Sequence, residues 1–158
     1  MRKLADVSVA NKTVALRVDL NVPIKDGIIL DDARIVAIIP TVEYLLSQNS
    51  KIILLSHFGR PVAGNFDLKF SLKPVAKKLS ELLNQEVSFI HSMEDASFKS
   101  TISVLENTRF LIGELENDID LSKKLGSMAE VYVFDAFGTS HREQASTFGA
   151  IHQANISC

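Results

Sequence analysis

The chain has 158 residues, a formal net charge of −2 at pH 7, and 46% hydrophobic and 23% charged residues. This size and mixture fit one soluble domain with its own core. The charge argues against a broadly basic surface of the kind that binds nucleic acid or anionic lipid. Cys158 is the sole cysteine, which excludes a disulfide within the chain and favours a reducing compartment.

The start of the chain and its apolar runs give no indication of export or of a membrane span. Residues 1–10 lack the apolar core of a secretory signal peptide. The longest apolar runs, 35–39 and 52–55, are far too short to span a bilayer. We therefore expect a cytoplasmic protein that does not contact a membrane.

Five short apolar segments predict β-strands, because near-continuous apolar runs are typical of parallel strands covered on both faces. These segments are 13–20, 51–56, 87–90, 101–105 and 131–134. Within the first, alternation places Leu16 and Val18 on one face and Arg17 and Asp19 on the other. Residues 24–29, centred on Asp26-Gly27, predict a small hairpin inserted after the first strand.

Three helices are predicted between the strands from apolar residues at helical spacing. The first, which includes Ile35 and Leu46 in its apolar stripe, begins after two aspartates, either of which could cap it. These aspartates are Asp31 and Asp32.

The second helix covers 72–83, with Ser71 as its predicted N-cap and Pro74 in its first turn. The third covers 117–125 and is predicted to end at Gly126. Strands that alternate with helices predict an α/β fold: a Rossmann-like, doubly wound parallel sheet with helices on both faces. We interpret 1–158 as one domain, and its ending at 154–158 suggests a chain truncated before a second domain.

Five arginines lie in a strand, shortly after one, or at the start of the next helix. They are Arg17, Arg34, Arg60, Arg109 and Arg142. Ligands of open α/β sheets bind at the carboxyl ends of the strands, where these guanidinium groups would gather with His57 and His141. Guanidinium forks suit carboxylate and phosphate oxygens, so the pattern indicates a compact ligand with several negative charges.

The structural alternative is that each arginine pairs with a nearby carboxylate. The candidate partners are Asp19, Glu106, Asp135 and Glu143. For Arg17 the specific alternative is a pair with Asp19 inside the sheet, since a charge in a covered strand is costly unless it is paired or functional. The sequence contains neither GxxxxGK[ST] nor a GxGxxG after a strand, so no nucleotide cradle is expected. No metal site is expected either.

Four segments resemble, in order, the signature motifs of phosphoglycerate kinases. They are RVDLNVP at 17–23, SHFGRP at 56–61, LENTRF at 105–110 and DAFGTSHR at 135–142. In addition, DARI at 32–35 lies where the family places an arginine beside the reacting end of its substrate. The resemblance covers nearly the whole chain.

The resemblance implies a phosphotransferase of glycolysis that moves a phosphoryl group between 1,3-bisphosphoglycerate and ADP, and between ATP and 3-phosphoglycerate in reverse. The implied substrate-binding residues are Asp19, Leu20, Asn21, Arg34, His57, Phe58, Gly59, Arg60, Arg109 and Arg142. Of these, Arg60, Arg109 and Arg142 are implied to bind the phosphate that is not transferred. Arg34 is the implied catalytic residue, next to the carboxyl group that exchanges the phosphoryl group, and Arg17 and His141 belong to the surrounding basic patch.

The resemblance also implies Mg²⁺ with ATP or ADP, bound mainly by a carboxyl-terminal domain that this chain lacks. That domain and 3-phosphoglycerate or 1,3-bisphosphoglycerate are the expected partners of a monomeric enzyme, and the isolated fragment is expected to be inactive. The chain departs from the usual motifs at Phe58, Thr108, Phe134 and Ser140, and Glu143-Gln144 replaces a small residue and a histidine. The alternative reading is a non-catalytic module that binds a sugar phosphate or another anion on the same fold.

Overall fold

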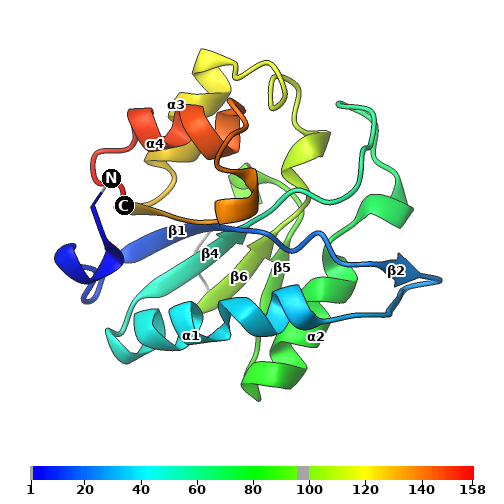
Figure 1. Cartoon of the computed structure of the whole chain (residues 1–158), viewed down its shortest axis with the longest axis horizontal. Coiled ribbons are helices and arrows are strands. Elements are labelled where there is room, and N and C mark those ends of the chain that lie inside the picture. Colours follow the sequence, from blue (N-terminus) through cyan, green and yellow to red (C-terminus); the bar gives the residue numbers. More distant parts are fainter. Residues whose placement is uncertain (1, 96–99) are drawn as a thin grey trace.

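The computed structural model describes residues 2–95 and 100–158. Its main sheet has five strands in the order β5-β6-β4-β1-β7, and all neighbouring strands are parallel (Figure 1). The strands are β1 (Thr13–Val18), β4 (Lys51–Leu55), β5 (Ser88–Ile90), β6 (Ile102–Leu105) and β7 (Val131–Asp135). The Rossmann-like parallel sheet is confirmed, although β1 ends at Val18, before Asp19 and Leu20.

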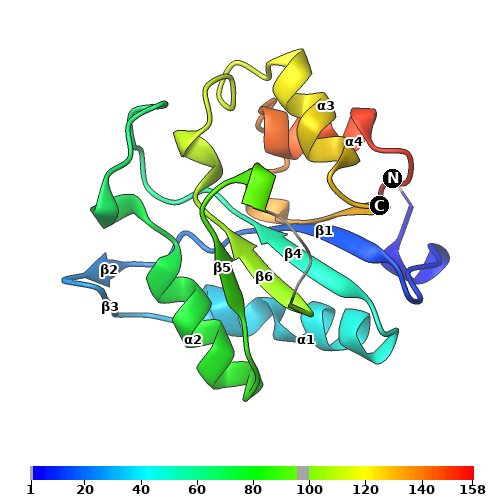
Figure 2. The same cartoon turned by 180° about the vertical axis from the view of Figure 1, so that it is seen from behind.

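Helices cover both faces of the sheet, as predicted (Figures 1 and 2). The helices are α1 (Ala33–Ser47), α2 (Lys73–Leu83), α3 (Ile119–Ser127) and α4 (Ala150–Gln153). Leu16 and Val18 of β1 share a buried apolar cluster with residues of α1 and α2. Ala15, on the opposite face of β1, shares a second cluster with Leu125 of α3 and Ala150 of α4. No helix in 2–95 or 100–158 is long and apolar enough to cross a membrane.

The inserted hairpin is also present. β2 (Ile24–Lys25) pairs antiparallel with β3 (Ile28–Ile29). The two turn residues, Asp26 and Gly27, have φ angles of 51° and 75°. Asp-Gly favours such left-handed turns, which explains why this dipeptide predicts the hairpin.

The helix ends differ in detail from the predictions. Asp32 occupies the N-cap position of α1 but its side chain makes no capping hydrogen bond, whereas Asp31 Oδ1 accepts from the Ala33 amide at 2.9 Å. Ser71 lies one residue before the N-cap position of α2, but its Oγ still accepts from the Lys73 amide at 3.2 Å. Caps depend on side-chain rotamers, which residue type alone does not determine.

The prediction that the third helix ends at Gly126 is wrong. Helix α3 starts two residues later, after Asp118, whose Oδ1 accepts from the Asp120 and Leu121 amides. Gly126 lies inside the helix, where a Cβ would approach the Ala150 carbonyl oxygen to 2.8 Å. The glycine therefore permits close packing of α3 against α4 rather than helix termination.

Candidate anion-binding site

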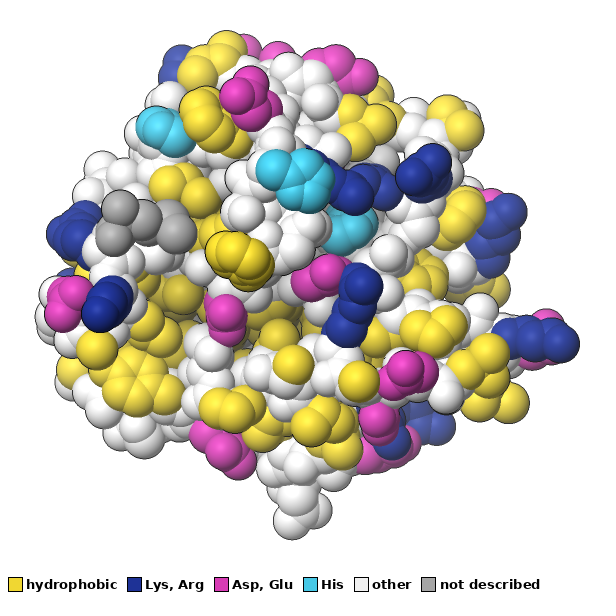
Figure 3. Space-filling model, in the orientation of Figure 1, with side chains coloured by type: hydrophobic (Ala, Val, Ile, Leu, Met, Phe, Trp, Pro, Cys, Tyr) yellow, Lys and Arg dark blue, Asp and Glu magenta, His cyan; other side chains and the backbone are white. Residues whose placement is uncertain are grey.

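The parallel sheet brings the segments that follow four strands to one edge. Asp19 follows β1, His57 follows β4, Arg109 follows β6 and Arg142 follows β7. On the face shown in Figure 3, histidine side chains lie next to Lys or Arg side chains, with acidic side chains close by. The predicted gathering of cationic groups at the carboxyl ends of the strands is therefore present.

Three of the arginines line one pocket. Arg60, Arg109 and Arg142 surround a pocket of about 310 Å³ together with Pro61 and Gln144. Arg60 is exposed, whereas only 9% of Arg109 is exposed. Within the described part of the chain, Arg109 Nε is buried and has no hydrogen-bond partner. A donor in that state next to two further guanidinium groups suits a ligand that supplies several anionic oxygens.

Asn107 fixes the loop that carries Arg109. Its Oδ1 accepts from the amides of Phe58 and Arg109 at 2.9 and 3.1 Å. Its Nδ2 donates to the carbonyl oxygens of Phe58 and Phe70 at 2.6 and 3.0 Å. Arg109 Nη1 in turn donates to the carbonyl oxygen of Gly59. The loops after β4 and β6 are therefore held as one unit.

Gly59 is required by the backbone at this point. It has a φ of 57°, and a Cβ there would lie 2.4 Å from Cδ1 of Phe70. Its amide donates to Asn21 Oδ1 at 2.9 Å, which ties the loop after β1 to the loop after β4. A glycine is thus needed both for its left-handed conformation and for the close approach of the Phe70 ring.

Arg17 lies behind this surface and is fully buried. Its Nε donates to Ser146 Oγ at 2.9 Å, its Nη1 donates to the Val18 carbonyl oxygen, and its Nη2 lies 3.3 Å from His57 Nδ1. Because a guanidinium can only donate, His57 Nδ1 is the acceptor, and the neutral ring carries its proton on Nε2. The alternative of a direct Arg17–Asp19 pair is wrong, because Arg17 uses these three partners instead.

The cationic groups lower one another's pKa. Burial lowers the pKa of His57 to about 3, with Arg17 and Arg109 adding to the effect. Burial and then the charge of Arg142 lower the pKa of Arg109. The site therefore holds more positive charge than its own carboxylates offset, and a bound anion would relieve this repulsion.

Arg34 forms a separate ion pair beside the cluster. Its Nη1 donates to Asp19 Oδ2 at 2.7 Å, and 54% of the Arg34 side chain is exposed. Asp19 Oδ1 also accepts from the Asn21 amide at 3.1 Å. This is the single case among the described residues in which a predicted arginine pairs with one of the four candidate carboxylates.

Two of the other candidate carboxylates have different partners. Glu106 accepts from Ser71 Oγ at 2.7 Å and from the Leu72 amide at 2.9 Å. Asp135 accepts from Thr41 Oγ1 at 2.6 Å. Because these two carboxylates hold helices in place, they do not neutralise the arginines of the pocket.

Two predicted site residues contribute no side chain to the surface. Leu20 and Phe58 belong to the apolar core with α1 and α2. The Leu20 amide donates to Ser56 Oγ at 2.9 Å, so this residue anchors the loop after β1. Any contact of Leu20 or Phe58 with a ligand is therefore limited to the backbone. Asn21 is half-buried and His141 is exposed.

The residues that support Arg17 are not evident from the sequence. Glu114, Ser146 and Tyr132 are almost fully buried beside Arg17. Tyr132 Oη donates to the Ser146 carbonyl oxygen at 2.6 Å, and burial raises the pKa of Tyr132. A fully buried arginine needs such partners, but nothing in the residue pattern indicated which distant residues supply them.

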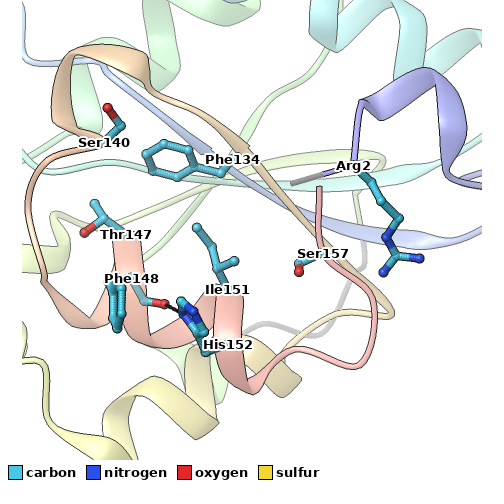
Figure 4. Close-up of a pocket in the computed structure, with 8 residues that line it drawn as sticks. All are labelled: Arg2, Phe134, Ser140, Thr147, Phe148, Ile151, His152 and Ser157. Carbon is cyan, nitrogen blue, oxygen red and sulfur yellow. Dashed lines mark hydrogen bonds between the residues drawn. The ribbon is translucent and has the colours of Figure 1, made fainter.

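A larger pocket lies elsewhere, between β7 and the chain's last residues (Figure 4). It measures about 670 Å³, and Phe134 and Ile151 line it with Arg2. His152 Nδ1 lies 2.8 Å from the Phe148 carbonyl oxygen on one side. Two of the unusual motif positions, Phe134 and Ser140, both line this pocket. With one arginine and a largely apolar lining, it lacks the charge of the three-arginine pocket.

Residues 2–95 and 100–158 hold no group of three or more His, Cys, Asp or Glu side chains that could bind a metal ion.

Comparisons with known proteins agree with the motif pattern. The sequence model of the family "Phosphoglycerate kinase" matches residues 4–158. Phosphoglycerate kinase from Desulfovibrio desulfuricans is 47% identical over 157 residues, which cover 99% of this chain. The homologue from Francisella tularensis subsp. holarctica is also 47% identical over 157 residues. The chain spans 40% of the length of each of these two relatives.

Solved structures show the same relationship. Phosphoglycerate kinase from Coxiella burnetii superposes with a TM-score of 0.94 at 40% identity, over 98% of this chain and 40% of that one. The enzyme from Pyrococcus horikoshii superposes with a TM-score of 0.84 at 36% identity, over 99% of this chain and 42% of that one. Sequence and fold therefore place this chain in the phosphoglycerate kinase family.

Proposed function

We propose that this chain supplies the 3-phosphoglycerate site of a kinase that transfers a phosphoryl group between 1,3-bisphosphoglycerate and ADP. The observation that supports this most directly is the pocket lined by Arg60, Arg109 and Arg142, in a chain of this family. Three guanidinium groups can surround a phosphate with paired hydrogen bonds. In this proposal they bind the phosphate that does not react.

Arg34 serves the reacting end of the substrate. It is the catalytic residue of the proposal, because negative charge is redistributed at the carboxyl group as the phosphoryl group leaves. Asp19, 2.7 Å from Arg34 Nη1, keeps the guanidinium at the edge of the sheet when no substrate is bound. Asp19 and Asn21 are also within the loop that faces the glycerate hydroxyl group in this proposal.

No general base is required. The acceptor in the direction of ATP use is already a carboxylate, and phosphoryl transfer depends mainly on positioning and on stabilisation of charge. With a pKa of about 3, His57 is neutral at pH 7 and does not exchange protons during the reaction. Its Nε2–H instead serves as a hydrogen-bond donor beside the arginines.

The nucleotide and Mg²⁺ bind to a carboxyl-terminal domain that lies outside this chain. This part of the proposal is supported by the chain's 40% coverage of the length of its relatives. Residues 1–158 are then the amino-terminal substrate-binding domain of a monomeric cytoplasmic enzyme. The chain alone has no kinase turnover, because the reaction needs both substrates enclosed between two domains.

Isothermal titration calorimetry of the chain with 3-phosphoglycerate and with ADP tests the proposal. We expect 3-phosphoglycerate to bind more tightly than ADP, with an affinity that falls as salt rises, because exposed charge contacts are screened. Arg60→Ala should weaken the binding of 3-phosphoglycerate, and Lys124→Ala, on the exposed surface of α3, should leave it unchanged. Tighter binding of ADP than of 3-phosphoglycerate would refute the assignment of the site.

A further inference from the structure

One chain of buried hydrogen bonds connects strand β1 with the segments that follow β4, β6 and β7. Glu114 Oε1 accepts from Ser146 Oγ at 2.5 Å, and Glu114 Oε2 accepts from the Ser146 amide at 3.0 Å. Ser146 Oγ then accepts from Arg17 Nε at 2.9 Å, and Arg17 Nη2 reaches His57 Nδ1. This chain joins the loop after β6, the segment after β7, strand β1 and the loop after β4.

The direction of these hydrogen bonds follows from the charges. The Ser146 hydroxyl has one proton, which it donates to the Glu114 carboxylate. Its lone pairs remain free to accept from Arg17, which can only donate. Arg17 then presents an N–H to His57 Nδ1, which leaves the proton of the neutral ring on Nε2. Glu114 therefore acts on His57 through position: it holds Ser146, and Ser146 holds Arg17 Nε, so that Arg17 Nη2 lies beside His57 Nδ1.

Glu114 also holds the Arg142 segment. Its carbonyl oxygen accepts from the Ala145 amide at 2.9 Å, three residues after Arg142. Glu114 itself lies five residues after Arg109, in the loop that carries this arginine. Only 1% of Glu114 is exposed, so it contacts the arginine pocket through these neighbours rather than directly.

Arg17 and Glu114 stabilise each other's charge in this buried position. Burial lowers the pKa of Arg17, and the charge of Glu114 acts against that change. Burial raises the pKa of Glu114, while the hydrogen bonds of Ser146 and the charge of Arg17 act against it. A buried charge with one partner removed is costly, so each of the two groups depends on the other.

We propose that Glu114 is a positioning residue for the anion site: through Ser146 and Arg17 it orients His57, and through the 142–146 segment it orients Arg142. The inference rests on the proposed function for the identity of the anion. It assigns to Glu114 an effect on ligand binding that its charge alone would not produce. A negative charge near an anion site weakens anion binding, so removing only the charge should strengthen that binding.

The opposite signs of these two effects give a decisive test. Glu114→Gln keeps the size of the side chain but removes the charge and the fixed direction of the Ser146 hydrogen bond. We expect Glu114→Gln to bind 3-phosphoglycerate about 10-fold more weakly, as substitutions of groups that orient a ligand's direct partners commonly do. The substitution is made in the whole protein, and the dissociation constant of 3-phosphoglycerate is measured by calorimetry. The matched control is Glu116→Gln, the same change of charge two residues away on the exposed surface, which should bind as the wild type does.

Equal or tighter binding by Glu114→Gln would overturn the proposal, since it would leave only a structural or purely electrostatic role. Should Glu114→Gln not fold, Ser146→Ala breaks the same chain without changing any charge and should also weaken binding. Unchanged binding by Ser146→Ala would equally overturn the proposal.

A second readout separates this inference from the proposed function. The ¹⁵N chemical shifts of His57 report which ring nitrogen carries the proton, whether or not 3-phosphoglycerate binds. We expect the Nε2–H form in the wild type and in Glu116→Gln. In Glu114→Gln and Ser146→Ala we expect a mixture of both neutral forms, because Arg17 is no longer held with its Nη2 beside His57 Nδ1. If the wild type bound no 3-phosphoglycerate, the proposed function would fail, and the His57 signals would still decide the role of Glu114. Unchanged His57 signals in both variants would contradict the inference.

Discussion

Arg34 Nη1 donates to Asp19 Oδ2 at 2.7 Å, so the guanidinium proposed for the reacting end is held by a carboxylate of the loop after β1. Arg60, Arg109 and Arg142 lie instead around one pocket. The structure thus separates the arginines into two groups, and this separation leads to different expected kinetics for each group.

Arg34→Ala should lower kcat by about 10²–10³-fold, if its loss resembles removal of one preorganised donor to the developing charge. Arg60→Ala should mainly raise KM, because it removes binding that substrate and transition state share. Arg34→Lys should restore only part of the activity, since a point charge lacks the two-pronged guanidinium fork. Steady-state kinetics on the whole enzyme provide the measurement. If Arg34→Ala kept kcat and only raised KM, Arg34 would be one more member of the phosphate-binding group.

Gly59→Ala should destabilise the fold more than Gly27→Ala. Both glycines have positive φ, so both substitutions carry a backbone cost of about 1 kcal/mol. At Gly59 the new Cβ would also lie 2.4 Å from a ring carbon of Phe70, whereas at Gly27 no atom lies within 4 Å. We expect a further loss of about 1–3 kcal/mol for Gly59→Ala from this overpacking. Urea unfolding of both variants measures the difference, and equal losses would contradict the close approach of Phe70.

Asn107→Ala should lower the free energy of unfolding by about 2–4 kcal/mol, because it leaves several buried backbone groups without partners. It should also weaken 3-phosphoglycerate binding, since Asn107 holds the loops of Gly59 and Arg109 together. Asn65→Ala, at an exposed position, is the control and should change neither quantity by much. Denaturant unfolding and calorimetry on the two variants give both numbers. Loss of stability without loss of affinity would show that Asn107 does not position the site.

His57 should make the stability of the protein depend on pH. Its ordinary pKa is 6.5 and its folded-state pKa is about 3, so between these values the unfolded chain binds a proton that the folded chain does not. The stabilising contribution is therefore complete above pH 6.5 and is lost as pH falls toward 3. Glu114, whose pKa is raised by burial, acts in the opposite sense, because the folded chain keeps its proton to a higher pH.

Comparison with His57→Gln isolates the histidine, because Glu114 is present in both proteins. Between pH 7 and pH 4 the wild type should lose about 3 kcal/mol of stability relative to His57→Gln. Chemical unfolding at a series of pH values measures this difference. Parallel pH curves for the two proteins would show that His57 is protonated in the folded state at pH 4, contrary to its burial beside Arg17.

The sequence by itself determined the class of fold and the edge of the sheet at which the site lies. Apolar runs and helical stripes are local signals, and they predicted the five strands, helices α1, α2 and α3, and the Asp26-Gly27 hairpin, but not the short helix α4. Parallel strands place all their carboxyl ends at one edge, so residues that follow strands, such as Asp19 and Arg109, were expected to meet there. The resemblance to the family motifs then predicted which substrate binds at this edge.

The hydrogen-bond partners of the charged groups are determined only by the tertiary structure. Ser146 lies 129 residues from Arg17, and Glu114 lies 32 residues from Ser146. Contacts over such separations depend on how strands and loops pack, so no local pattern marks them. The role of Gly126 also depends on a distant segment. The sequence predicts a helix end there, whereas the structure places Gly126 inside α3 where α4 packs against it. Arg17 was expected at the surface with the other four arginines, but it is buried and its Nη2 lies beside His57 Nδ1. A charge removed from water must find its hydrogen bonds within the protein.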